Sequence, residues 1–88
     1  MSWKKKFAAN VRYEDLPNLT KFRIIDEPES LGKGKYRVRL ETETNEFQLP
    51  TYEGTIGDIV YAQGDGWCEA YSEIGSDGNT YIRFRGVE

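Results

Sequence analysis

The stretch Tyr36-Arg37-Val38-Arg39-Leu40-Glu41-Thr42-Glu43 decides the fold class of this chain, because apolar or β-forming side chains alternate with charged ones along it. Successive side chains of a β-strand point to opposite faces, so a period of two residues places each kind on its own face. The stretch therefore predicts a half-buried strand, with one face against a core and a charged face in water.

Weaker patterns of the same kind occur on both sides of this stretch. They are separated by turn-forming segments, including a polar loop at 26–34, a turn at 44–46 and a Gly-rich turn at 75–79. Pro50 is expected to end the strand that precedes it, and Cys68 and Ala70 are expected to face the core. We predict an all-β, mainly antiparallel fold, a small barrel of five or six strands. The expected strands lie at 22–25, 36–43, 47–49, 58–62, 67–71 and 80–85.

The first twenty residues are predicted to form an N-terminal arm or short helix, and residues 21–88 the barrel. Trp3, Phe7 and Val11 follow one another at four-residue intervals, which gives a short helix one apolar stripe. A mobile tail is the alternative, because short basic termini are often unstructured. Pro17 favours a turn at 16–19. With 88 residues, the chain is expected to fold as one domain.

The composition excludes several kinds of chemistry. The chain has no His and one Cys, so it has no His general base, no His-ligated metal and no internal disulfide. Nothing in the spacing selects a catalytic pair among the 15 acidic residues. Asp65 and the segment 77–79 are read as turns rather than calcium ligands, because they lack the spacing of a calcium loop. We expect no enzyme activity, no cofactor and no metal.

The N-terminus begins with a basic run, but polar residues interrupt any apolar segment that follows it. No stretch approaches the ~20 apolar residues of a membrane-spanning helix. The single Cys68 is compatible with a reducing compartment. A cytoplasmic location without a membrane partner is therefore expected.

The last third of the chain resembles a known family. The segments Gly57-Asp58-Ile59-Val60-Tyr61, Gly64-Asp65-Gly66-Trp67-Cys68-Glu69-Ala70 and Asp77-Gly78-Asn79-Thr80-Tyr81-Ile82 are similar to the strand and turn pattern of bacterial SH3-like domains. The resemblance covers residues 57–88 and implies a small barrel with Trp67 as a wall of its ligand groove. The Pro-x-x-Tyr pattern that closes the family's fold is replaced by Phe84-Arg85-Gly86-Val87. The resemblance thus implies architecture rather than a Pro-rich ligand.

Charge is distributed unevenly along the chain. Residues 1–40 contain ten basic and five acidic residues, and residues 41–88 contain two basic and ten acidic residues. The net charges of the two parts are therefore +5 and −8, within a total of −3. Either the opposite charges pair across a folded sheet, or they form a polarised surface.

The acidic part contains most of the aromatic residues that lie outside the expected core. Aromatic side chains flanked by carboxylates suit a basic or Pro-containing protein partner. Packing beneath the N-terminal segment is the other interpretation. The first functional hypothesis is therefore a non-catalytic module that binds a protein. Its predicted contact patch consists of Tyr61, Asp65, Trp67, Glu69, Tyr71 and Tyr81.

Two other functions remain open. Arginine beside aromatic residues is typical of surfaces that bind single-stranded nucleic acid or another anion. The competing interpretation pairs these arginines with Glu41, Glu43, Glu69 and Glu73. A small phage-type inhibitor of a cellular enzyme is the third hypothesis, and an open edge strand would also permit a homodimer. The residues predicted for nucleic-acid or anion binding are Lys4, Lys5, Lys6, Arg37, Arg39, Arg83 and Arg85.

Overall fold

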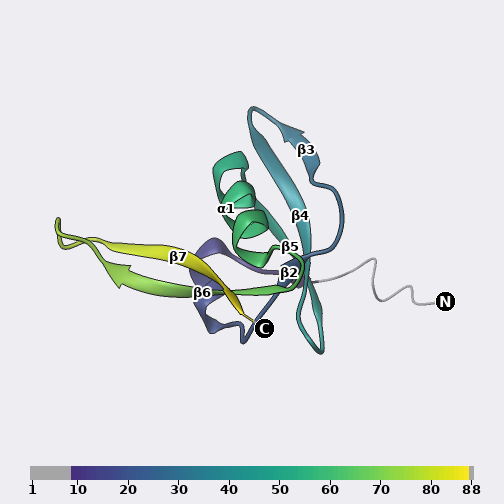
Figure 1. Cartoon of the computed structure of the whole chain (residues 1–88). Coiled ribbons are helices and arrows are strands. Elements are labelled where there is room, and N and C mark those ends of the chain that lie inside the picture. The colour runs from purple at the N-terminus through teal and green to yellow at the C-terminus, as the bar shows by residue number, and fades with distance from the viewer. Residues whose placement is uncertain (1–8, 88) are drawn as a thin grey trace.

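A computed structural model describes residues 9–87 of the chain, which form a small, mainly β fold with two sheets (Figure 1). The predicted predominance of strands is confirmed. The elements, in chain order, are β1 (Ala9–Asn10), the 3₁₀ helix η2 (Tyr13–Asn18), β2 (Arg23–Ile24), β3 (Glu29–Gly32), β4 (Lys35–Glu41), β5 (Glu46–Tyr52), the α-helix α1 (Glu53–Gln63), β6 (Trp67–Ile74) and β7 (Thr80–Val87).

The first sheet is built around the antiparallel pair β4 and β5. Its order is β1-β5-β4-β2, and β3 pairs with a different part of β4. Val38 and Leu40 are buried on one face of β4, whereas Arg37 and Arg39 remain partly exposed. The alternation predicted from the sequence of this strand is therefore confirmed.

The prediction that Pro50 ends its strand was wrong, because β5 continues to Tyr52. The carbonyl of Gln48 accepts a 2.8 Å hydrogen bond from the N–H of Val11, so the backbone groups of Gln48 face β1. Pro50 lies two residues further along and faces the same side, beyond the two residues that β1 covers. No ladder bond is lost there, and the missing N–H of proline is tolerated.

The second sheet is the two-stranded ribbon of β6 and β7, which projects away from the rest of the chain (Figure 1). Cys68 is fully buried and Ala70 nearly so, which confirms the predicted core face of β6. A single bridge between Phe22 and Cys68 joins the ribbon to the segment that leads into β2. Residues 9–87 thus form two open sheets, and no closed barrel is present among them.

The strand predicted at 58–62 was wrong, because this segment belongs to α1. Its β-branched residues favour a strand locally, but Ile56 and Ile59 lie three residues apart and are both buried. Docking of this apolar face outweighs the local preference. Gly64, with φ 52°, ends the helix, and its N–H donates a 3.2 Å hydrogen bond to the carbonyl of Val60.

The predicted N-terminal helix lies partly outside the described residues, which do not include Trp3 and Phe7. From Ala9 the prediction was wrong, because Ala9–Asn10 is a strand parallel to β5. The predicted turn at 16–19 falls at the end of η2, and the predicted loop at 26–34 contains β3. Val11 and Leu16 are buried, so this part of the chain contributes to the core.

One core connects the two sheets, α1 and η2. Phe22 is fully buried in this core, and the centre of its ring lies 6.4 Å from that of Phe84 in β7. In the part of the chain that the structure describes, no helix has the length and apolar character required to span a membrane. The buried apolar residues are Val11, Leu16, Phe22, Val38, Leu40, Leu49, Ile56, Ile59, Cys68 and Ala70.

Candidate functional site

One face of the β6–β7 ribbon collects most of the aromatic residues of the predicted patch. The register places Glu69 opposite Arg85, Tyr71 opposite Arg83 and Glu73 opposite Tyr81. Side chains directly opposite each other lie on the same face of a sheet. Trp67, Glu69, Tyr71 and Tyr81, four of the six predicted residues, therefore share the face that points away from Cys68 and Ala70.

The arginines of β7 lie among these residues and pair with their acidic neighbours. Arg85 Nε is 2.5 Å from Glu69 Oε1, and its guanidinium carbon is 4.6 Å from the centre of the Tyr71 ring. Arg83 Nε is 3.5 Å from Glu73 Oε2. The pairing expected for these two arginines is observed. The face therefore carries both charges in alternation, and it is not the acidic patch that the sequence indicates.

Trp67 lies at the end of this face, and two cations lie close to its ring. Lys21 Nζ lies 5.2 Å from the centre of the ring, and the guanidinium carbon of Arg23 lies 4.5 Å from it. Arg23 also pairs with Glu41 at 2.6 Å. Trp67 thus contacts the first sheet through Arg23.

The other two residues of the predicted patch lie at α1. Tyr61 is on the helix and is 91% exposed, the most exposed large hydrophobic side chain among the described residues. Asp65 is exposed in the turn between α1 and β6. Asp65 therefore lies before the ribbon in the chain rather than on its face, and the side chain of Tyr61 is open to solvent.

A groove between α1 and the ribbon brings Tyr61 and Tyr71 together with the arginines of β7. Asp58, Tyr61 and Ala62 line it from α1, at positions that share one face of a helix. The helix–ribbon groove, as we call it, has a volume of about 430 Å³. Its remaining lining comes from Tyr71 and from Ile82, Arg83, Phe84, Arg85 and Gly86.

Sequence reasoning missed Asp58 and the helical wall of this groove, because it assigned 58–62 to a strand. The spacing of Asp58, Tyr61 and Ala62 at i, i+3 and i+4 was the available signal. The groove also combines residues from two separate hypotheses, since Tyr61 and Tyr71 were predicted to bind protein and the β7 arginines to bind an anion.

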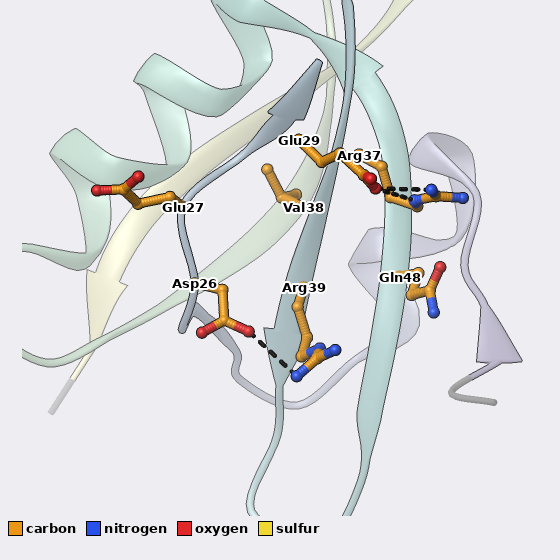
Figure 2. Close-up of a pocket in the computed structure, with 7 residues that line it drawn as sticks. All are labelled: Asp26, Glu27, Glu29, Arg37, Val38, Arg39 and Gln48. Atoms are coloured by element: carbon orange, nitrogen blue, oxygen red, sulfur yellow. Dashed lines mark hydrogen bonds and ion pairs between the residues drawn. The ribbon is translucent and has the colours of Figure 1, made fainter. Parts of the chain in front are cut away.

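The arginines of β4 line a different hollow, of about 420 Å³ (Figure 2). Arg37 Nη2 lies 2.6 Å from Glu29 Oε1, and Arg39 Nη1 lies 3.1 Å from Asp26 Oδ2. Glu27 and Gln48 also contribute to its lining. The structure does not bring these arginines to those of β7. Their shorter ion pairs are with residues of 26–29, and Arg39 Nε also lies 4.0 Å from Glu46 Oε1. None of these partners is a glutamate that the sequence suggested.

The groups that most often perform chemistry are enclosed or serve local structure. Burial, with a smaller contribution from the charge of Glu69, raises the pKa of Cys68 to about 12, so its thiol stays neutral. A hydrogen bond from the Tyr81 hydroxyl and one from the Asn79 amide lower the pKa of Asp77, which stabilises the ribbon turn. No cluster of three or more potential metal ligands occurs within residues 9–87.

Lys4, Lys5 and Lys6, the remaining residues of the nucleic-acid hypothesis, lie outside the described residues. Comparisons of the chain with protein-family models, with curated proteins and with solved structures gave no match. The candidate site therefore rests on the geometry of the helix–ribbon groove.

Proposed function

We propose that this chain is a non-catalytic module that recognises a protein partner through the helix–ribbon groove and the adjoining face of the ribbon. The observation that carries the proposal is the groove itself, where an exposed Tyr61 stands beside Tyr71, Arg83 and Arg85. Tyrosine and arginine are among the residues that contribute most to binding at protein interfaces.

The side chains on the ribbon are already held in place, which supports this role. Arg85 is fixed between Glu69 and Tyr71, and Arg83 lies between Glu73 and the ring of Tyr81. Ordering long side chains on binding costs about 0.5–1.5 kcal/mol for each one. Side chains that are ordered before the partner arrives lose less of this free energy.

The SH3-like resemblance of residues 57–88 stays a prediction, and it agrees with a recognition role more than with catalysis. We also propose a cytoplasmic location, in which the buried Cys68 thiol stays reduced.

Nucleic-acid binding is the second candidate, because two-stranded ribbons that carry arginine and aromatic residues bind nucleic acids in other proteins. The ribbon of this chain projects outward (Figure 1). Its register places Arg83, Arg85, Tyr71 and Tyr81 on one face. The helical wall of the groove favours the protein partner, because a phosphate backbone carries a charge at every step and would meet the carboxylate of Asp58, whereas a peptide can place an uncharged side chain there.

The test places a photo-reactive phenylalanine analogue at position 61 and, as a control, at position 31. Leu31 is 44% exposed and lies in β3, on the other sheet. We expect one protein of the native cell to be crosslinked from position 61 and not from position 31. Equal crosslinking from both positions, or none from position 61, contradicts the proposal.

Paired substitutions then identify the surface. Arg83→Gln with Arg85→Gln should abolish the crosslink, whereas Arg37→Gln with Arg39→Gln should preserve it. Titration with single-stranded and duplex DNA at low salt, where phosphate contacts are strongest, tests the second candidate. Tight binding that the β7 variant loses would favour nucleic acid over protein.

A further inference from the structure

Within residues 9–87, β7 pairs with β6 on one edge and with no strand on the other. The bridge between Phe22 and Cys68 shows which backbone groups of β7 lie on this open edge. The N–H and C=O of Cys68 both bond to Phe22, each at 2.9 Å, so they point away from β7. In an antiparallel pair, residues alternate between facing the partner strand and facing away from it. Gly86 is opposite Cys68 and therefore also faces away from β6, as do Phe84 and Ile82.

These outward groups of β7 border the helix–ribbon groove. Five consecutive residues of β7, 82–86, line it. The carbonyl of Ile82 accepts only a long bond of 3.5 Å from the Tyr13 hydroxyl. No backbone hydrogen bond from another element reaches the N–H of Ile82, Phe84 or Gly86 within residues 9–87. A strand edge thus lies open next to a hollow that is backed by a helix.

We propose that the helix–ribbon groove binds an extended acidic peptide segment of a partner protein, which adds to β7 as a further strand. This inference rests on the proposed function and specifies how the partner is held. Main-chain hydrogen bonds to Ile82 and Phe84 supply the affinity, as in other cases of strand addition to an open sheet edge. Five strand residues span roughly 13 Å, so about five residues of the partner fit.

Charge identifies the kind of segment. On an added strand, every second side chain lies beside Arg83 and Arg85, which are 56% and 60% exposed. A guanidinium has five N–H donors, so one glutamate partner leaves others free. Acidic side chains at alternate positions therefore complement these arginines, and the intervening side chains face α1 at Asp58 and Tyr61.

A second copy of this chain is a poorer occupant. Antiparallel pairing of two β7 strands centred on residue 83, 84 or 85 places an arginine opposite an arginine. Like charges directly opposite each other destabilise a sheet. A basic segment meets the same repulsion from Arg83 and Arg85.

The test uses two blocked synthetic heptapeptides as probes, one alternating glutamate with valine and one alternating lysine with valine. The full chain, labelled with nitrogen-15, is titrated with each peptide and observed by NMR. We expect the glutamate peptide to bind at least about tenfold more tightly than the lysine peptide. Equal binding of the two peptides, or none of the glutamate peptide, overturns the proposal.

Proline substitutions separate edge pairing from other contacts in the groove. Ile82→Pro removes an outward N–H and leaves the bonds between β6 and β7 in place, so binding should weaken about tenfold. Ile82→Ala shortens the same side chain and keeps the N–H, so binding should persist. Ser72→Pro is the matched control, because Ser72 is paired with Ile82 and its N–H lies on the opposite edge of the ribbon. This variant should bind the peptide as the unmodified chain does. Equal affinity of Ile82→Pro and Ile82→Ala overturns edge pairing.

Amide hydrogen exchange provides a measurement that needs no variant. On addition of the glutamate peptide, exchange at Ile82 and Phe84 should slow, whereas exchange at Arg83, whose amide faces β6, should change little. An unchanged rate at Ile82 and Phe84 overturns the inference. The proposed function fails separately, because it requires crosslinking from position 61 by a cellular protein, whatever the peptides do.

Discussion

The guanidinium carbon of Arg23 lies 4.5 Å from the centre of the Trp67 ring, while its Nε lies 2.6 Å from Glu41 Oε2. Arg23 belongs to the first sheet and Trp67 begins the ribbon. One side chain thus contacts both sheets, close to the bridge between Phe22 and Cys68 that joins the ribbon to the segment before β2.

Replacement of Arg23 should therefore cost more than the loss of an ordinary surface ion pair. A cation over an aromatic ring contributes about 0.5–1 kcal/mol, and a partly exposed ion pair contributes up to about 1 kcal/mol. We expect Arg23→Gln to lower the free energy of unfolding by about 1–2 kcal/mol, measured by urea denaturation. Arg37→Gln, which breaks a pair without an aromatic ring, should cost less than about 1 kcal/mol. Equal losses contradict a role for Trp67.

Gly86 should not tolerate a side chain. A Cβ at this position would lie 2.6 Å from the carbonyl oxygen of Ala62, and a backbone atom cannot move aside as a side chain can. Gly86→Ala should lower the free energy of unfolding by about 1–3 kcal/mol. Gly57→Ala is the matched control, because nothing lies within 4 Å of the added Cβ and the position is inside α1. This control should stabilise the chain by up to about 1 kcal/mol. If Gly57→Ala proved less stable than Gly86→Ala, the close contact between Gly86 and the carbonyl of Ala62 would be refuted.

The buried thiol of Cys68 should make stability fall at alkaline pH. Burial raises its pKa to about 12 in the folded chain, whereas an unfolded chain loses the proton near its usual pKa. The thiol's contribution is therefore complete below the unfolded pKa and is lost as pH rises toward 12. The free energy of unfolding, measured by urea denaturation, should decrease between about pH 7 and about pH 10, and this decrease should be smaller in Cys68→Ala.

Alkylation supplies a second measurement on the same residue. Because Cys68 is fully buried, iodoacetamide should react only when the chain opens, and urea should accelerate the reaction. Rapid alkylation without urea would show that the site is open.

The ribbon turn should report the hydrogen bond between Tyr81 and Asp77. The Tyr81 hydroxyl is the main cause of the lowered pKa of Asp77, and the Asn79 amide adds to it. Tyr81→Phe should raise the pKa of Asp77 toward its usual value, as measured by NMR titration of the carboxyl group. The stability that this pair contributes is present above the usual pKa of aspartate and is lost as pH falls. The free energy of unfolding of the variant should therefore decrease less at acid pH than that of the unmodified chain.

The sequence predicts those parts of the structure where local pattern and tertiary packing agree. Val38 and Leu40 are buried, as the strict alternation of apolar and charged residues predicts. Cys68 and Ala70 form the inner face of β6 as expected. The turn at 75–79 also follows from its glycines, Asp77 and Asn79.

The remaining features depend on contacts between distant segments. Ile59, Val60 and Tyr61 favour a strand by their side chains, yet burial of Ile56 and Ile59 makes the segment helical. The helix–ribbon groove is bounded by this helix, so it was not predictable while 58–62 was read as a strand. The partners of Arg37 and Arg39 were missed because β3 and the residues before it were read as a loop.

Within residues 9–87, one isolated backbone bridge rather than a hydrogen-bonded ladder joins the ribbon to the segment before β2, so side-chain packing also holds the ribbon in place. The packing of Phe22 against Phe84, and of Arg23 against Trp67, therefore contributes to the position of the ribbon beside α1. Substitutions at Phe22 or Arg23, which do not line the groove, should therefore change its width without altering any residue of its walls. The width of the groove can thus change independently of the chemistry of its walls.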